Sequence, residues 1–183
     1  MVKDIAKTGL VLFLICAVCA VLCAWVNSFT APQIEENLRL ANKKALEAVA
    51  GSYEVGETKT VSDNAVVKEA TPLLQNGKVM GYALQLSGSG YGGQFTIIAA
   101  YDAKGALLKA KMTSDSETAG LGKKAENDWY MDIFTGMGDT AEFPASKNDL
   151  PSEQTALVNG ASVTFKGVTT ALKNGSNYIK EAH

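Results

Sequence analysis

The stretch that decides the fold runs from Val79 to Thr113 and reads VMGYALQLSGSGYGGQFTIIAAYDAKGALLKAKMT. It holds three largely apolar runs of strand length, at 79–86, 94–101 and 106–113. Glycine-rich SGSGYGG and the turn sequence DAKG separate these runs. Strands joined by such short turns pair antiparallel with their neighbours. This stretch therefore predicts a three-stranded antiparallel meander.

Helical patterns flank the meander on both sides. Apolar residues recur at helical spacing in 33–50, which Gly51 should end, and again in 165–179. A further helix is expected over 125–134, short strands and turns over 53–75, a turn at Asn76-Gly77, and a loop-rich stretch over 136–151. The predicted fold class is α+β: an antiparallel sheet with flanking helices, preceded by one N-terminal transmembrane helix.

The transmembrane prediction rests on an uncharged stretch near the N-terminus. Gly9 to Val26 reads GLVLFLICAVCAVLCAWV, and about 20 mostly apolar residues suffice for a helix to cross the hydrocarbon core. Lys3 and Lys7 precede it, which predicts a cytoplasmic N-terminus and an extracytoplasmic main domain in a single-pass cell-membrane protein. We expect a leader at 1–7, a membrane helix at 8–29, a stalk helix at 30–51 begun or broken near Ala31-Pro32, and a domain at 52–183.

A cleaved signal peptide is the alternative for this stretch. Its apolar region is usually about 7–15 residues, which is shorter than the present one. The sequences Val18-Cys19-Ala20 and Leu22-Cys23-Ala24 would nevertheless serve as cleavage sites.

The same stretch holds all three cysteines, Cys16, Cys19 and Cys23, which share one helix face. That face either packs in lipid, where small apolar residues suit helix contacts, or meets a redox centre of a partner subunit.

Composition excludes several classes of function. The net charge is -2 with no basic run, which argues against a nucleic-acid partner. Membrane lipid is an expected partner because of the apolar stretch. The single histidine, His183, is the last residue, and no cysteine lies beyond the apolar stretch. We therefore expect no histidine-based catalytic triad, no metal site and no thiol chemistry in the outer domain.

The segment Asn159-Gly160-Ala161-Ser162-Val163-Thr164 precedes the last predicted helix. A helix N-terminus offers free backbone N–H groups and a positive dipole end, which together favour an anion such as phosphate. Ser162 and Thr164 are also good N-cap residues, so helix capping without a ligand is the alternative.

These residues resemble the flavinylation motif of the FMN-binding domain found in the G subunit of the Rnf complex and the C subunit of the sodium-pumping NADH:quinone oxidoreductase. Two further segments are similar to that family. Residues 117–122 read ETAGLG, with Ala119 replacing the family's proline, and residues 90–93 read GYGG. Asn159 departs from the hydroxyl residue usual at the first motif position.

The resemblance implies a covalent FMN whose phosphate is esterified to Thr164. The implied cofactor-binding residues are Thr164, Gly160, Ala161, Ser162, Glu117, Thr118, Gly120, Leu121, Gly122 and Tyr91. For Glu117, a solvated loop carboxylate is the alternative that the residues alone favour. Trp129, Tyr130 and Phe134 are expected in the core rather than stacked on the flavin.

The same resemblance implies a function and partners. The chain would be an electron carrier in an ion-pumping ferredoxin:NAD oxidoreductase of Rnf type, a redox subunit that is not catalytic alone. Its partners would be the other membrane subunits and a flavin transferase that matures it from FAD. A stand-alone anchored flavoprotein and a flavin-free anchored binding domain remain alternatives. The coupling ion, the flavin potential and the immediate electron donor and acceptor are left open.

Overall fold

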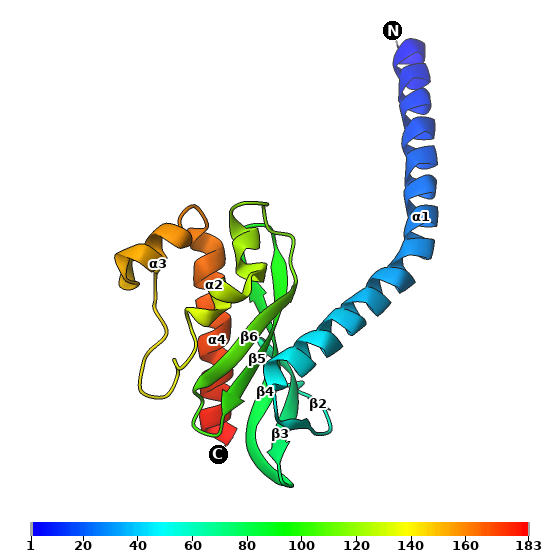
Figure 1. Cartoon of the computed structure of the whole chain (residues 1–183). Coiled ribbons are helices and arrows are strands. Elements are labelled where there is room, and N and C mark those ends of the chain that lie inside the picture. Colours follow the sequence, from blue (N-terminus) through cyan, green and yellow to red (C-terminus); the bar gives the residue numbers. More distant parts are fainter. Residues whose placement is uncertain (1, 183) are drawn as a thin grey trace. The chain divides into compact units, whose positions relative to one another are not determined.

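The computed structural model describes residues 2–182, so Met1 and His183 lie outside the described residues (Figure 1). The chain divides into two compact units, 1–40 and 41–183. The first unit consists of the N-terminal part of helix α1, which spans Val2–Ala50. The second unit holds the end of α1, the sheet and all the later helices.

In the first unit, α1 has the length and composition needed to cross a membrane. An 18-residue window near its N-terminus has a mean hydropathy of 2.8, and none of that window is buried in the described structure. The rest of the chain would cover a core helix of similar composition. Here the apolar side chains of the window are exposed instead, as expected for a helix that contacts lipid or another protein. Cys16, Cys19 and Cys23 are all exposed on it.

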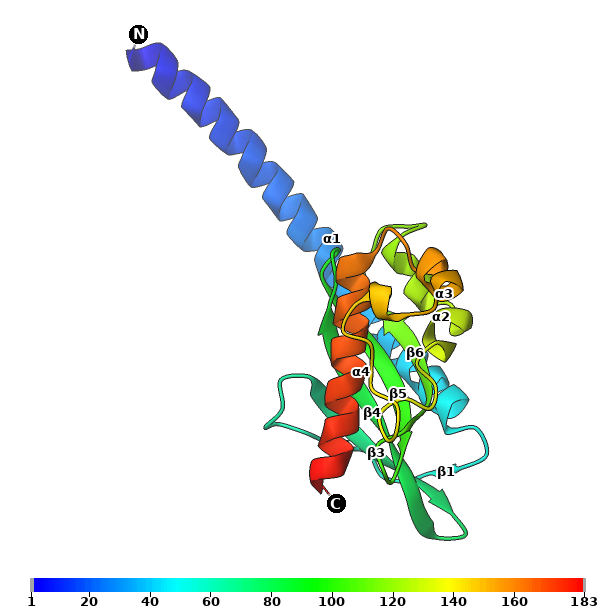
Figure 2. The ribbon, with the colours of Figure 1, turned by 90° about the vertical axis from the view of Figure 1, so that its left-hand side faces the viewer.

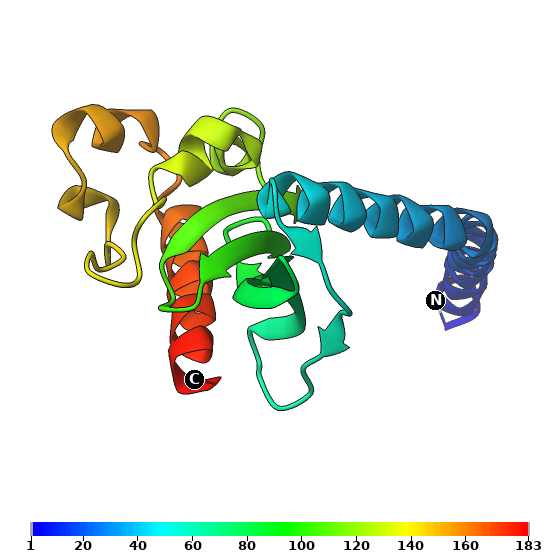
Figure 3. The same cartoon turned by 60° about the horizontal axis from the view of Figure 1, so that its bottom comes forward.

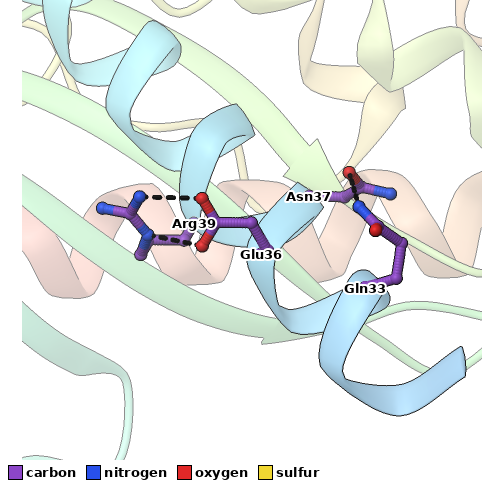
Figure 4. A network of polar contacts seen from close by, with 4 residues as sticks. All are labelled: Gln33, Glu36, Asn37 and Arg39. Atoms are coloured by element: carbon purple, nitrogen blue, oxygen red, sulfur yellow. Dashed lines mark hydrogen bonds and ion pairs between the residues drawn. The ribbon is translucent and has the colours of Figure 1, made fainter. Parts of the chain in front are cut away.

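The helix continues through Pro32 without interruption, contrary to the predicted break near that residue. Proline removes the hydrogen bond that its own N–H would donate, and the strong helix formers that follow can carry the helix on. Beyond Pro32 the helix carries polar side chains that contact one another, and Figure 4 shows four of them. Gln33 donates to Asn37, and both Nε and Nη2 of Arg39 donate to Glu36 at 2.8 Å. These hydrogen bonds from Arg39 lower the pKa of Glu36.

In the second unit, a six-stranded antiparallel sheet has the order β1-β3-β4-β5-β6, with β2 also paired to β3. The predicted meander is confirmed as its centre and far edge. The strands are β1 Glu54–Val55, β2 Lys59–Thr60, β3 Val67–Gln75, β4 Lys78–Ser89, β5 Gln94–Asp102 and β6 Leu107–Ser114. The strand β4 runs to Ser89, so the turn that was predicted to start at Ser87 is only Gly90–Gly93.

The segment 53–75, expected to hold short strands and turns, contains β1, β2 and the nine-residue strand β3, which is longer than expected and carries Pro72 and two charged residues. The carbonyl of Pro72 accepts a hydrogen bond from Gly56 N–H, on the side away from β4. The nitrogen of Pro72 therefore faces the side of β3 where β1 and β2 pair, at the position between these two strands. No hydrogen bond of the sheet is lost there, although proline has no N–H. The turn at Asn76-Gly77 is confirmed, and both residues have positive φ, 52° and 76°.

Both faces of the sheet are covered, which explains the unbroken apolar run in β5. Residues Ile97, Ala99 and Tyr101 pack toward α4, Ser162–Ala182, whereas Ile98 and Ala100 pack toward the last turns of α1. Figure 2 shows α4 lying along the strands, and Figure 3 shows the end of α1 beside them. On the α1 side the helix contributes Ala45, Val49 and Ala50.

The helices after the sheet differ in detail from the prediction. The expected helix at 125–134 is two shorter pieces, the 3₁₀ helix η1 Gly122–Glu126 and α2 Asp128–Asp132, with Asn127 extended between them. The stretch predicted as loop contains the short helix η2 Lys147–Asp149, and α3 Ser152–Leu157 follows it. Short elements of this kind carry too little periodicity to be predicted from sequence.

Candidate functional site

Three chain segments meet at one end of the second unit, around the start of α4. They are the turn Gly90–Gly93 after β4, the loop 115–121 after β6, and the turn 159–161 before α4. The sheet register brings the first two together, because Ser89 pairs with Gln94 and Thr96 pairs with Ser114. These segments carry the three sequence motifs, which the fold therefore brings to one place.

The side chain of Thr164 lies at the floor of this site. Its Oγ1 donates to Oε2 of Glu117 at 2.8 Å, and the two residues are only 1% and 6% exposed. The second carboxylate oxygen, Oε1, accepts from the backbone N–H of Gly92 at 3.2 Å. One buried carboxylate thus joins α4, the loop after β6 and the β4–β5 turn.

The burial of Glu117 corrects the interpretation that it is a solvated loop carboxylate. Its neighbours Ser116 and Thr118 are exposed, and Glu117 alone turns inward from the loop. A Cβ at Gly90 would collide with Oε1 of Glu117, and a Cβ at Gly122 would collide with Oε2. These two glycines are needed because the carboxylate fills the space that a side chain would take.

The hydroxyl of Thr164 does not cap its helix, contrary to the capping alternative. The helix α4 begins at Ser162, and its first hydrogen bond runs from Phe165 N–H to the carbonyl of Ala161 at 2.9 Å. Thr164 therefore lies within the first turn, where backbone N–H groups have no partner inside the helix. The turn that leads into the helix depends on Gly160, whose φ is +88°, and a Cβ there would stand 2.8 Å from Leu121 Cδ2.

Among the other predicted site residues, Ala161 is buried, whereas four have exposed side chains. Tyr91 is 80% exposed and Leu121 is 44% exposed, and Thr118 and Ser162 are also exposed. Val163, which was not singled out as a contact residue, is 54% exposed beside them. The site thus has a polar buried floor formed by Thr164 and Glu117, and an exposed rim to which Tyr91, Leu121 and Val163 contribute.

Behind the floor lie polar groups that the sequence analysis did not assign to the site. Tyr130 Oη, Asp115 Oδ2 and Thr113 Oγ1 are buried, and none has a hydrogen-bond partner among residues 2–182. Burial raises the pKa of Tyr130, and the nearby charge of Glu117 raises it further. The ring of Tyr130 packs on Phe165 with centroids 6.4 Å apart, and Phe134 is buried as well, so the expected core position of these two residues is confirmed. Trp129, which was also expected in the core, is 41% exposed, so that expectation is wrong. Tyr130 is recognised as a neighbour of the site only from its position near Glu117, because no sequence motif includes it.

A groove of about 680 Å³ runs along the neighbouring face of α4. Its walls come from the ends of β4 and β5 and from the first three turns of the helix, and include Ser87, Ser89, Gln94, Val163, Lys166 and Thr170. Thr164 does not line it, because its side chain points to Glu117 instead. The groove therefore adjoins the site without containing the hydroxyl.

Two family descriptions match parts of this chain. Residues 1–49 match the family described as RnfG N-terminal region, and residues 90–177 match the family described as FMN-binding domain. The second match includes all three segments of the site.

Several relatives align from end to end. The G subunit of the Na(+)-translocating ferredoxin:NAD(+) oxidoreductase complex of Acetobacterium woodii is 31% identical over 185 residues, covering 93% of this chain and 89% of that protein. The G subunit of the ion-translocating oxidoreductase complex of Yersinia pestis is 29% identical over 196 residues, covering 98% and 92%. Its counterpart in Shewanella loihica is 26% identical over 197 residues, covering 98% and 91%.

Proposed function

Because the chain belongs to the G-subunit family of ion-translocating oxidoreductase complexes, in which it is an electron-transfer subunit with an FMN-binding domain, we propose that its FMN is joined as a phosphoester to Oγ1 of Thr164. The observation that carries this proposal is the position of Thr164. It is a hydroxyl in the first turn of α4, at the point where the three motif-bearing segments meet.

The residues around Thr164 fit the group by their chemistry. Thr164 offers a hydroxyl that can form the ester, and the first turn of α4 offers backbone N–H groups and a positive dipole end for the phosphate. Leu121, Val163 and Tyr91 offer exposed apolar and aromatic surface against which a flat ring can pack. When bound, FMN supplies one- and two-electron transfer, so the protein itself needs no catalytic acid or base.

Membrane attachment would follow from the first unit of the chain. The apolar part of α1 at 8–29 would span the bilayer as a single pass, and Lys3 and Lys7 would hold the N-terminus in the cytoplasm. The outer domain would then work on the extracytoplasmic side, where an ester bond keeps the flavin from diffusing away. A flavin transferase would attach it there.

The partners would be the remaining membrane subunits of an Rnf-type complex. The relatives that support this are named as G subunits of ion-translocating complexes, and one is named as part of a ferredoxin:NAD(+) oxidoreductase. The chain would receive electrons from one subunit and pass them to another, and would turn over no substrate alone.

The attachment is tested by co-expressing the full chain with a flavin transferase and recording fluorescence of the denatured protein in a gel. Wild type should fluoresce and Thr164→Val should be dark. Thr170→Val is a matched control, because Thr170 is an exposed threonine of the same helix, and it should fluoresce like wild type. A fluorescent Thr164→Val band, or a dark wild type beside an active transferase, would overturn the proposal.

A further inference from the structure

We propose that Glu117 is the residue that closes the flavin-acceptor site of the unmodified domain: its buried carboxylate holds the Thr164 hydroxyl out of reach, and attachment of FMN expels Glu117 from that position. This inference rests on the proposed attachment at Thr164. It concerns how the acceptor becomes available and what changes in the domain once it is used.

The first step of the argument is the burial of the acceptor. Thr164 is only 1% exposed, and its hydroxyl proton is already donated to Glu117 at 2.8 Å. Leu121 lies against Gly160 and so joins the loop after β6 to the turn before α4. Phosphoryl transfer requires the phosphorus to approach the attacking oxygen in line with the leaving group. The closed domain presents no such approach to Oγ1.

The second step concerns what the ester does to the hydrogen bond. In the transfer, Oγ1 of Thr164 attacks the flavin-side phosphorus of FAD. The new Oγ1–P bond forms as the P–O bond to the AMP moiety breaks, AMP leaves with that electron pair, and the hydroxyl proton passes to a base of the transferase. No group is oxidised or reduced. The product oxygen can no longer donate, so Glu117 loses its buried partner on α4.

The third step is electrostatic. The ester phosphate carries one negative charge, and it is attached to the very oxygen that stood 2.8 Å from Oε2 of Glu117. Two like charges at such a distance repel strongly in a buried place where solvent does not screen them. The carboxylate and the phosphate therefore cannot both occupy the floor of the site in their charged forms.

The loop that carries Glu117 has an exposed side into which the carboxylate could turn. Residues 118–121 are exposed, and Gly120 has a φ of +76° with open space around it. Outward rotation would place the carboxylate in water beside Ser116 and Thr118. The unpartnered Oη of Tyr130 lies close enough for the charge of Glu117 to act on it, and it can donate to the phosphate when Glu117 has left.

The first arm of the test measures the rate of flavin transfer to the purified, unmodified full chain in detergent. Transferase and FAD are added, and gel fluorescence is followed in time for wild type, Glu117→Ala and Glu126→Ala. Glu126 is a matched control, an exposed carboxylate on the 3₁₀ helix that follows the loop. Loss of a charge-assisted hydrogen bond should raise the open fraction, so Glu117→Ala should react roughly tenfold faster or more, to the same final yield. Glu126→Ala should match wild type.

A slower or unchanged rate for Glu117→Ala would overturn the closing role. A slower rate would assign Glu117 a part in activating the hydroxyl instead. Failure of the attachment itself looks different, because wild type and all variants would then remain dark at every time.

The second arm avoids variants that fail to fold. Hydrogen exchange is compared between unmodified and flavin-loaded wild type, with attention to the backbone amides of residues 116–122. Expulsion of Glu117 predicts faster exchange in the loaded protein over this loop, and no change in the central strand β5. Equal or slower exchange of the loop in the loaded protein would refute the expulsion.

Discussion

Replacing Thr164 by valine tests the buried contact at the floor of the site. Valine keeps the branched shape of threonine and exchanges the hydroxyl for a methyl group. The change removes the hydroxyl that donates to Oε2 of Glu117 at 2.8 Å. The carboxylate then keeps the hydrogen bond from the backbone N–H of Gly92 to its other oxygen. Glu117 is 6% exposed, so water does not replace the lost donor while the loop stays closed.

The expected cost follows from the charge on the acceptor. A hydrogen bond to a charged group contributes about 1.5–3 kcal/mol to the free energy of unfolding, more than a neutral pair. For a chain of this size, 1 kcal/mol moves Tm by about 2–4 °C, so Thr164→Val should lower Tm by roughly 3–12 °C. Thr164→Ser keeps the hydroxyl and should retain most of the stability.

The assay is thermal unfolding of the unmodified full chain in detergent, followed by near-ultraviolet circular dichroism. Thr170→Val serves as the control, because this exposed position should change the free energy of unfolding by no more than about 0.5 kcal/mol. If Thr164→Val unfolds at the same temperature as Thr170→Val and wild type, the Thr164–Glu117 contact does not stabilise the domain, and the reasoning fails.

Three further predictions concern the core that supports the site. Burial raises the pKa of Tyr101 and of Tyr130 in the folded state. The free energy of unfolding should therefore keep its full value below about pH 10, where tyrosine in the unfolded chain is still protonated. Above that pH it should fall by about 1.4 kcal/mol per pH unit for each tyrosine. A urea midpoint that does not change between about pH 9 and 11 would contradict this. In Gly175→Ala the new Cβ would stand 2.6 Å from Tyr101 Oη, which donates to the carbonyl of Leu172. We expect a loss of about 1–3 kcal/mol in urea unfolding, and an unchanged midpoint would show that α4 shifts without cost. Ser176→Ala removes a buried hydroxyl that donates to the Gly105 carbonyl at 2.7 Å, and should cost about 1–2 kcal/mol in the same assay, whereas a stability gain would mean that this contact is unfavourable.

The sheet was the most predictable part of the fold, for identifiable reasons. The strands β4 to β6 are apolar runs closed by strong turn signals, and Asp102 fixes one turn by accepting from the backbone N–H groups of Lys104 and Ala106. Short strands were expected over 53–75, but the full length of β3 was not, because Pro72 argues against a central strand. The pairing of β3 shows that the proline nitrogen faces the side away from β4. The local sequence does not specify on which side of a strand the neighbouring strand will pair.

The site was predictable in its parts and not in its contacts. The three motifs are visible along the chain, but local sequence does not reveal whether a loop carboxylate turns inward. The polar neighbours of Glu117 favour a solvated side chain, whereas tertiary packing against Gly90 and Gly122 buries it. Tyr130 was correctly expected in the core, yet its relation to Glu117 depends on how α2 packs beside α4, which spacing alone does not reveal.

The central claim is that Thr164 carries the flavin, and peptide mapping of protein taken from its native membranes tests it most directly. Trypsin should release residues 148–166, which contain Asn159 to Thr164 and end at Lys166. The account predicts that this peptide carries the mass of one FMN and that fragment ions place it on Thr164. An unmodified peptide, or a flavin located on Ser162, would contradict the account.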